Sequence, residues 1–280
     1  MKKIMKNGSS MMRAVTSELR VARVTWLTNV RAAMENRVAF ALQIFGMMLN
    51  DMAYVIIWML FFQAVGTVNG WGSMETVGLL GFGTISFGLA FGFGGGATWL
   101  TQYVEDGSLD SFLLAPRNVL WRTITSRFDL PAFGDVIFGA LLLAVFALKM
   151  GLSWVSIAMM IGMILPAACI TFSVSLCCGC VAFYVQDPQH VSFSLFKMFL
   201  APSMYPAGLF PGLAKVFFIF VVPSIVVGGL PIEAVRQESF PLFFLVWAVG
   251  IFWLFLGIFV FYRSLRRYES GNAIGLRSGN

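Results

Sequence analysis

The sequence predicts an all-α integral membrane protein formed by a single transmembrane domain over residues 1–280. Hydrophobic residues make up 59% of the chain and charged residues only 11%, and the chain contains 29 phenylalanines. The apolar residues gather in runs close to the roughly 20 residues that an α-helix needs to cross a bilayer. This composition lies far outside that of soluble domains, so a sizeable soluble domain is excluded.

The first predicted element is an interfacial helix over residues 16–37. Apolar residues recur there at helical spacing and share one face, namely Leu19, Ala22, Trp26, Val30 and Ala33. Charged residues occupy the opposite side. A helix with such a face is expected to lie in the headgroup plane and to contact membrane lipid without crossing the bilayer.

Six membrane spans are predicted from the apolar runs, at 38–65, 77–101, 129–150, 153–184, 191–205 and 240–262. The fifth is short. A further run at 211–236 is almost long enough to span, but prolines at 211, 223 and 231 and the pair Gly228–Gly229 divide it. Pieces this short suit a re-entrant hairpin of two half-helices before the last span.

Lysine and arginine predict the orientation. Eight precede the first span, three lie in 102–128 and four follow the last span, whereas the connections at 66–76 and 151–152 have none. By the positive-inside rule, both termini and the 102–128 segment are cytoplasmic, and the protein is a multi-pass protein of the cytoplasmic (inner) membrane. Because the basic residues sit at span ends, the net charge of +6 does not point to a nucleic-acid partner.

No pattern typical of an enzyme site is present. The four cysteines, Cys169, Cys177, Cys178 and Cys180, lie in one apolar run without the spacing of zinc ligands, and are interpreted as packing residues. The single histidine, His190, is a loop residue. The chain has no Gly-Lys pair and therefore no Walker A motif, so we expect no catalytic residue, no metal and no cofactor on this chain.

Polar residues inside the apolar runs are candidates for function. Asn50 and Asp51 fall near the middle of the first span, Asp129 near the start of the third, and Asp135 inside it. Such residues normally face a partner or a wet cavity, so their role is either in a pathway or structural. For Asp129, an interfacial ion pair with Arg127 is the simpler interpretation. Proton transfer through these acids would make the protein a secondary, proton-coupled transporter, which is the alternative function; a membrane-embedded enzyme is a third class.

The segment "EDGSLDSFLLAPRN" (105–118) interrupts the apolar pattern. Gly107 and Ser108 can break the chain and cap a helix, and Asp110 falls in its first turn. Three apolar residues at i, i+3 and i+4 form a small face, namely Leu109, Phe112 and Leu113. Pro116 ends the turn. The segment 107–116 is therefore predicted to be a short rigid knob suited to docking into a groove on another protein.

This segment, followed by "RFDLPAFGDVIFGALLLAVFAL" (127–148), resembles the membrane subunits of type-2 ABC transporters. The resemblance is closest to a bacterial permease family whose loop reads [DE]-G-x-L-D-x-x-L-L-x-P, with R-F-D opening the next span. The matching residues are Asp106, Gly107, Leu109, Asp110, Leu113, Leu114 and Pro116, then Arg127, Phe128 and Asp129. A second stretch, 205–236, is similar to the re-entrant segment of such permeases.

The resemblance implies a permease of an ATP-driven exporter that works by alternating access. Residues 107–116 would form the cytoplasmic coupling helix, and contact with the ATPase would involve Asp106, Gly107, Leu109, Asp110, Phe112, Leu113, Leu114 and Pro116. Separate ABC ATPase subunits would bind ATP and Mg. The permease would pair with a second copy or with a related permease.

Overall fold

The computed structural model describes residues 20–32, 34–115 and 117–268. The described part of the chain is built from helices, with one isolated bridge between Val68 and Trp71 and no regular strand, which confirms the all-α prediction. Within these described ranges, five helical stretches are long and apolar enough to cross a membrane. They are α2 (Arg37–Val65), α3 with its continuation α4 (Ser73–Glu105), α7 (Ala132–Met150), α8 with η2 (Trp154–Phe183) and α12 (Phe240–Leu265).

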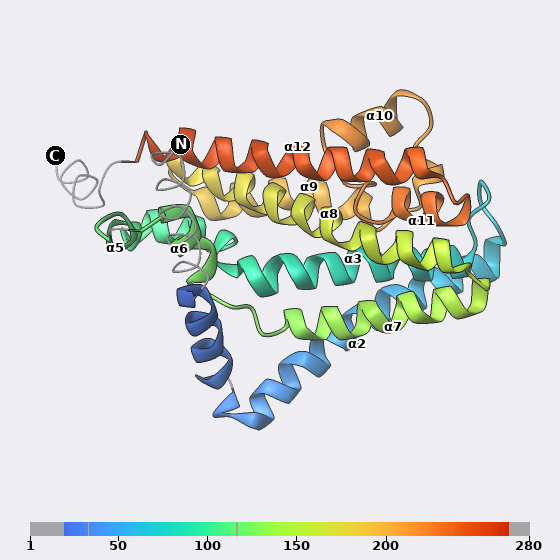
Figure 1. Cartoon of the computed structure of the whole chain (residues 1–280), viewed down its shortest axis with the longest axis horizontal. Helices are drawn as coiled ribbons and strands as arrows, with labels where there is room; N and C mark the ends of the chain where they lie inside the picture. The colour runs from blue at the N-terminus through green and yellow to red at the C-terminus, as the bar shows by residue number, and fades with distance from the viewer. Residues whose placement is uncertain (1–19, 33, 116, 269–280) are drawn as a thin grey trace, which may run out of the picture.

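The predicted count of six spans is not reproduced, because the fifth predicted span falls on a short helix. Helix α9 (Pro188–Ser203) has 16 residues. At ~1.5 Å per residue it is about 24 Å long, less than the ~30 Å of a bilayer core. Prolines limit it at both ends, since Pro188 is its first residue and Pro202 its second-last. It packs against α8 (Figure 1).

Helix α3 (Ser73–Gly94) lies at the centre of the bundle and packs against α7 and α8. Its glycines allow backbones to touch. A Cβ atom added to Gly88 would lie 2.8 Å from the carbonyl oxygen of Ala132, and one added to Gly139 of α7 would lie 2.6 Å from the amide nitrogen of Ile85. Close backbone approach at small residues is the usual way in which membrane helices pack.

Helix α2 packs against the bundle less extensively than α3 does, because most of its side chains are exposed. It meets the bundle chiefly at α7, where a Cβ added to Gly134 would lie 2.7 Å from the carbonyl oxygen of Ile44. Its N-terminus is capped by Asn36, which accepts a hydrogen bond from the amide of Ala39 at 3.0 Å. It ends at Gly66, whose φ of +79° is accessible to glycine.

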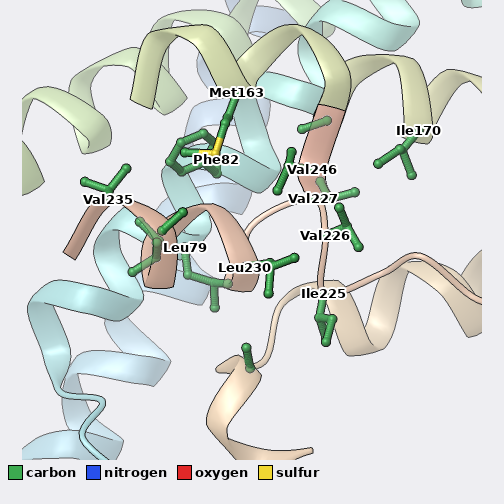
Figure 2. Packing of buried hydrophobic residues seen from close by; sticks show 14 of the residues in the cluster. Leu79, Phe82, Met163, Ile170, Ile225, Val226, Val227, Leu230, Val235 and Val246 are labelled. Carbon is green, nitrogen blue, oxygen red and sulfur yellow. The ribbon is translucent and has the colours of Figure 1, made fainter. Parts of the chain in front are cut away.

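Residues 211–236 form two short helices, α10 (Leu213–Phe220) and α11 (Gly229–Arg236), joined by a buried connection. Figure 2 shows Ile225, Val226 and Val227 of this connection packed with Leu230 against the helices of the core. Both helices lie at the end of the bundle opposite to α5 (Leu109–Leu113) (Figure 1).

The N-terminal helix covers residues 20–32. Ala22 on its predicted apolar face is fully buried, and Trp26 packs edge-on against Phe93 with ring centroids 5.2 Å apart. Leu19 and Ala33, which complete the predicted face, lie outside the described residues. The helix is oriented across the ends of α3 and α7 in Figure 1, in contrast to the long helices.

Candidate functional site

Three short helices close one end of the bundle. They are α4 (Leu100–Glu105), α5, and α6 (Val119–Thr125), and they lie at the same end as the C-terminal end of α12 (Figure 1). The turn into α5 is fixed by Gly107, with φ of +72°, and by Asp106, whose Oδ1 accepts a hydrogen bond from the Ser108 amide at 2.9 Å. Ser108 makes no side-chain cap, so the carboxylate of Asp106 orders this turn where the sequence suggested Ser108.

The apolar face predicted for α5 is divided between two directions. Leu109 is 0% exposed and belongs to a cluster with Leu100 and Tyr103 of α4. The ring of Phe112 meets Tyr103 edge-on at 5.4 Å between centroids, and the guanidinium of Arg122 lies 5.3 Å from the Phe112 ring centroid. Leu109 and Phe112 therefore anchor the helix to its neighbours and are not free to dock elsewhere.

The outward side of α5 is formed by the two leucines that follow. Leu113 is 40% exposed and Leu114 is 86% exposed, whereas the large aliphatic side chains of the adjoining cluster are buried. Pro116, predicted to end the knob, lies outside the described residues. The docking surface that α5 offers is thus smaller than predicted and is centred on Leu113 and Leu114.

Tyr268, just beyond α12, is a neighbour of α5 that the sequence analysis missed. Its ring packs edge-on against Phe183 at 6.0 Å, and burial, together with the nearby carboxylates of Asp110 and Asp106, raises the pKa of its hydroxyl. The Asp110 residue takes part in an interaction within the structure and is not a free surface charge. The end of the last long helix therefore lies beside the knob.

Asp51 of α2 and Asp135 of α7 are brought together by the fold. Both are buried, at 9% and 4% exposure, and their carboxyl groups interact directly. Among the described residues, Asp51 Oδ2 and Asp135 Oδ1 have no hydrogen-bond partner. Two carboxylates in contact inside an apolar bundle cannot both keep their charge without a large cost, so this geometry favours one shared proton.

The other two polar candidates lie close to this pair: the Asn50 side chain neighbours the carboxyl of Asp51, and Asp129 is near enough to Asp135 for their carboxyl groups to interact electrostatically. Asn50 is exposed on α2. Asp129 precedes α7, and burial raises the pKa of its carboxyl. No ion pair joins Asp129 to Arg127 in the described structure, because the guanidinium of Arg127 lies over the ring of Trp99, 4.0 Å from its centroid. The interfacial ion pair considered for Asp129 is not found.

The opposite end of the bundle holds charged contacts that the sequence analysis missed. Lys215 of α10 pairs with Glu233 of α11 at 2.8 Å. Arg236 pairs with Glu75 of α3 at 3.4 Å and donates a hydrogen bond to the carbonyl of Gly70 at 2.9 Å. These contacts tie α10, α11 and the start of α3 together. Arg236 lies far along the chain from Glu75 and Gly70, and Lys215 and Glu233 lie on two different helices, so no helical spacing signals these contacts.

No group of three potential metal ligands occurs within the described ranges, and the four cysteines are free thiols. The features that remain for function are the knob at one end and the polar residues near the long helices. Helices of membrane length around a buried central helix define a multi-pass membrane protein.

The family model described as ABC-2 family transporter protein matches residues 48–272. This match covers most of the 280 residues, and the chain belongs to that family. The predicted resemblance to type-2 ABC permeases is thereby confirmed, and the chain is a transporter membrane subunit of a permease type. The narrower family defined by the loop motif stays a prediction. No curated protein and no solved structure matches the chain.

Proposed function

We propose that this chain is the permease subunit of an ATP-driven exporter in the cytoplasmic membrane, and that α5 is the element to which an ATPase subunit docks. The observation that carries the proposal is the arrangement of the knob. Leu114, directly after α5, is 86% exposed, whereas Leu109 within α5 is fully buried, in a chain that belongs to a transporter family. Exposed apolar groups on a rigid element are typical of a docking site.

The contacts that anchor α5 explain how a movement of this helix would be transmitted to the transport pathway. Leu109 and Phe112 join α5 to α4 and α6, and α4 continues from the central helix α3 through the turn η1 (Gly95–Ala97). Binding and hydrolysis of ATP, with its Mg, would take place in the partner. Movement of α5 would then tilt α3 and switch the access of a central pathway between the two sides.

The position of the knob supports the proposed orientation of the helices in the membrane. Helix α5 and the end of α12 lie at one end of the bundle, which is the end that the arginines assign to the cytoplasm (Figure 1). Both termini are then cytoplasmic. Helix α9 with the residues after it would complete a sixth crossing, and α10 and α11 would enter the outer leaflet as the re-entrant pair.

A second permease is the partner that α2 suits. Gln43 and Asn50 are both exposed on α2, whose exposed side chains are mostly apolar, and a spacing of seven places them on one face. Polar side chains on a lipid-facing surface are costly, and membrane helices commonly satisfy them by hydrogen bonding to a neighbouring helix. A dimer formed along α2, with the same chain or a related one, would satisfy both.

Affinity purification in mild detergent tests the proposal, with ATP hydrolysis as the readout. A co-purifying protein with a Walker A motif is expected. Leu114→Ser should weaken its retention by about 10-fold or more, since burying a leucine side chain contributes ~1.5–3 kcal/mol. Leu213→Ser is the matched control, because Leu213 is 87% exposed but lies in α10 at the opposite end.

Equal retention of the ATPase by the Leu114→Ser variant and the wild type would contradict docking at α5. Proton-driven transport by the purified chain without any ATPase would overturn the function itself and would restore the secondary-transporter alternative.

A further inference from the structure

A cavity of about 580 Å³ lies near the α5 end of the bundle, between the end of α3 with α4, the end of α8, and the start of α9. Its size falls within the ~300–1,000 Å³ that is typical of small-molecule sites. It is separate from the docking surface of α5 and from the Asp51–Asp135 pair, neither of which lines it. Nothing in the coupling of α5 to an ATPase requires this cavity.

Among the described residues of the lining, Asp129 is the only acid, His190 is the only basic side chain, and lysine and arginine are absent. The fold places it there by close backbone contact: a Cβ added to Gly95 would lie 3.3 Å from the amide nitrogen of Asp129. The carboxyl is half-buried and has no ion-pair partner among the described residues. Burial without a countercharge raises its pKa, which a bound cation would reverse.

The remaining walls are rich in aromatic rings, contributed by Phe91, Trp99, Phe193 and Phe196. The chain's own cations already use two of these rings. Arg127 lies over Trp99 at 4.0 Å and Lys197 over Phe193 at 4.3 Å from the ring centroids. The ring faces therefore accept positive charge in this environment.

These two cations do not make the cavity an anion site. Both Arg127 and Lys197 are exposed, so solvent screens their charge, whereas Asp129 is half-buried and screened less. The rings of Phe91 and Phe196 lie 5.7 Å apart and continue the apolar surface inward. An aromatic or otherwise apolar body would fit against them while its charge meets Asp129.

We propose that this cavity binds an amphipathic organic cation, with Asp129 as the countercharge and the aromatic rings as the apolar wall. The inference rests on the proposed transport function, because such a cation would be the exported substrate. It assigns a ligand class to residues that the docking of an ATPase does not involve.

Tetraphenylphosphonium and tetraphenylborate test the proposal, since they share one shape and carry opposite charge. Each is titrated separately into the detergent-purified full chain by calorimetry, with detergent alone subtracted. Tetraphenylphosphonium should bind, and tetraphenylborate should bind at least about 10-fold more weakly. Asp129→Asn should reduce tetraphenylphosphonium binding by about 10-fold, because the substitution removes the negative charge that faces the bound cation.

Asp129→Glu, which keeps the charge, should retain most of the binding. Asp187→Asn is the matched control, because Asp187 is an exposed acid directly before α9 that does not line the cavity, and its binding should equal that of the wild type. Equal binding of the two ions, or unchanged binding in Asp129→Asn, would overturn the proposal. The assay contains no ATPase, so the capture of an ATPase by a chain that fails this test would refute the ligand class alone.

Discussion

The contact between α3 and α7 makes a sharp prediction about stability, because two glycines of the same bundle differ only in the space around them. A Cβ added to Gly139 would lie 2.6 Å from the amide nitrogen of Ile85 and 2.9 Å from the carbonyl oxygen of Gly81. A Cβ added to Gly83 would meet only the ring of Phe87, at 3.9 Å. Gly139→Ala should therefore destabilise the protein, and Gly83→Ala should not.

The expected loss of folding stability in Gly139→Ala follows from two opposing contributions, a steric cost and a gain in helix propensity. Forcing an extra methyl group into a packed interior costs about 1–3 kcal/mol. Alanine recovers up to ~1 kcal/mol through its higher helix propensity. The obstructing atoms at Gly139 are backbone, which cannot turn aside, so the net loss should be about 1–2 kcal/mol. At ~2–4 °C for each kcal/mol, the melting temperature should fall by roughly 2–8 °C.

Thermal unfolding in detergent, followed by tryptophan fluorescence, measures both variants under the same conditions. Gly83→Ala should melt at or slightly above the wild-type temperature, since it gains propensity without a clash. The reasoning would be refuted if Gly139→Ala melted as high as Gly83→Ala, because the backbones of α3 and α7 would then be farther apart than described.

Three further predictions concern other contacts. The pKa of the Asp129 carboxyl is raised, so the folded state holds the carboxyl proton more tightly than the unfolded chain does. The free energy of unfolding should therefore fall as pH rises from about 4 through the raised pKa. Asp129→Asn should reduce this pH dependence in melting curves recorded from about pH 4 to about pH 8. Arg236→Ala should lower stability by about 1 kcal/mol in thermal melts, and Glu75→Gln should add little once Arg236 is gone, because they form one contact. Replacing both Gln43 and Asn50 with leucine should reduce chemical cross-linking between two copies about 5-fold or more, whereas unchanged cross-linking would exclude α2 from the dimer contact.

The long helices could be predicted because their signal is local. An apolar run bounded by proline, glycine or polar residues gives both the position and the approximate length of a span. The last span is an example: it was predicted at 240–262 and the helix covers Phe240–Leu265. The run at 191–205 does not form a membrane-length helix, because Pro188 and Pro202 limit the helix at its two ends.

The charged contacts at the end opposite α5 could not be predicted, because they join residues that only the folded chain brings together. Glu75 lies at the start of α3 and Arg236 at the end of α11. The pairing of Asp51 with Asp135 has the same origin: it requires α2 and α7 to approach closely at Gly134, and the sequence shows only that each acid is unusual where it stands. Rarity within a membrane span identifies such residues but not their partners.

The knob shows why periodicity alone cannot assign roles within one face. Burial in a core and docking onto a partner both select apolar residues at helical spacing, so Leu109, Phe112 and Leu113 give the same signal in the sequence. What separates them is contributed by other segments, since Tyr103 covers Phe112 from α4 while nothing in the described structure covers Leu114. Substitutions of Leu109 and Leu114 should therefore have different effects. Leu109→Ala removes a fully buried side chain and should cost ~2–5 kcal/mol of folding stability, whereas Leu114→Ser should leave the melting temperature unchanged and weaken the retention of the ATPase.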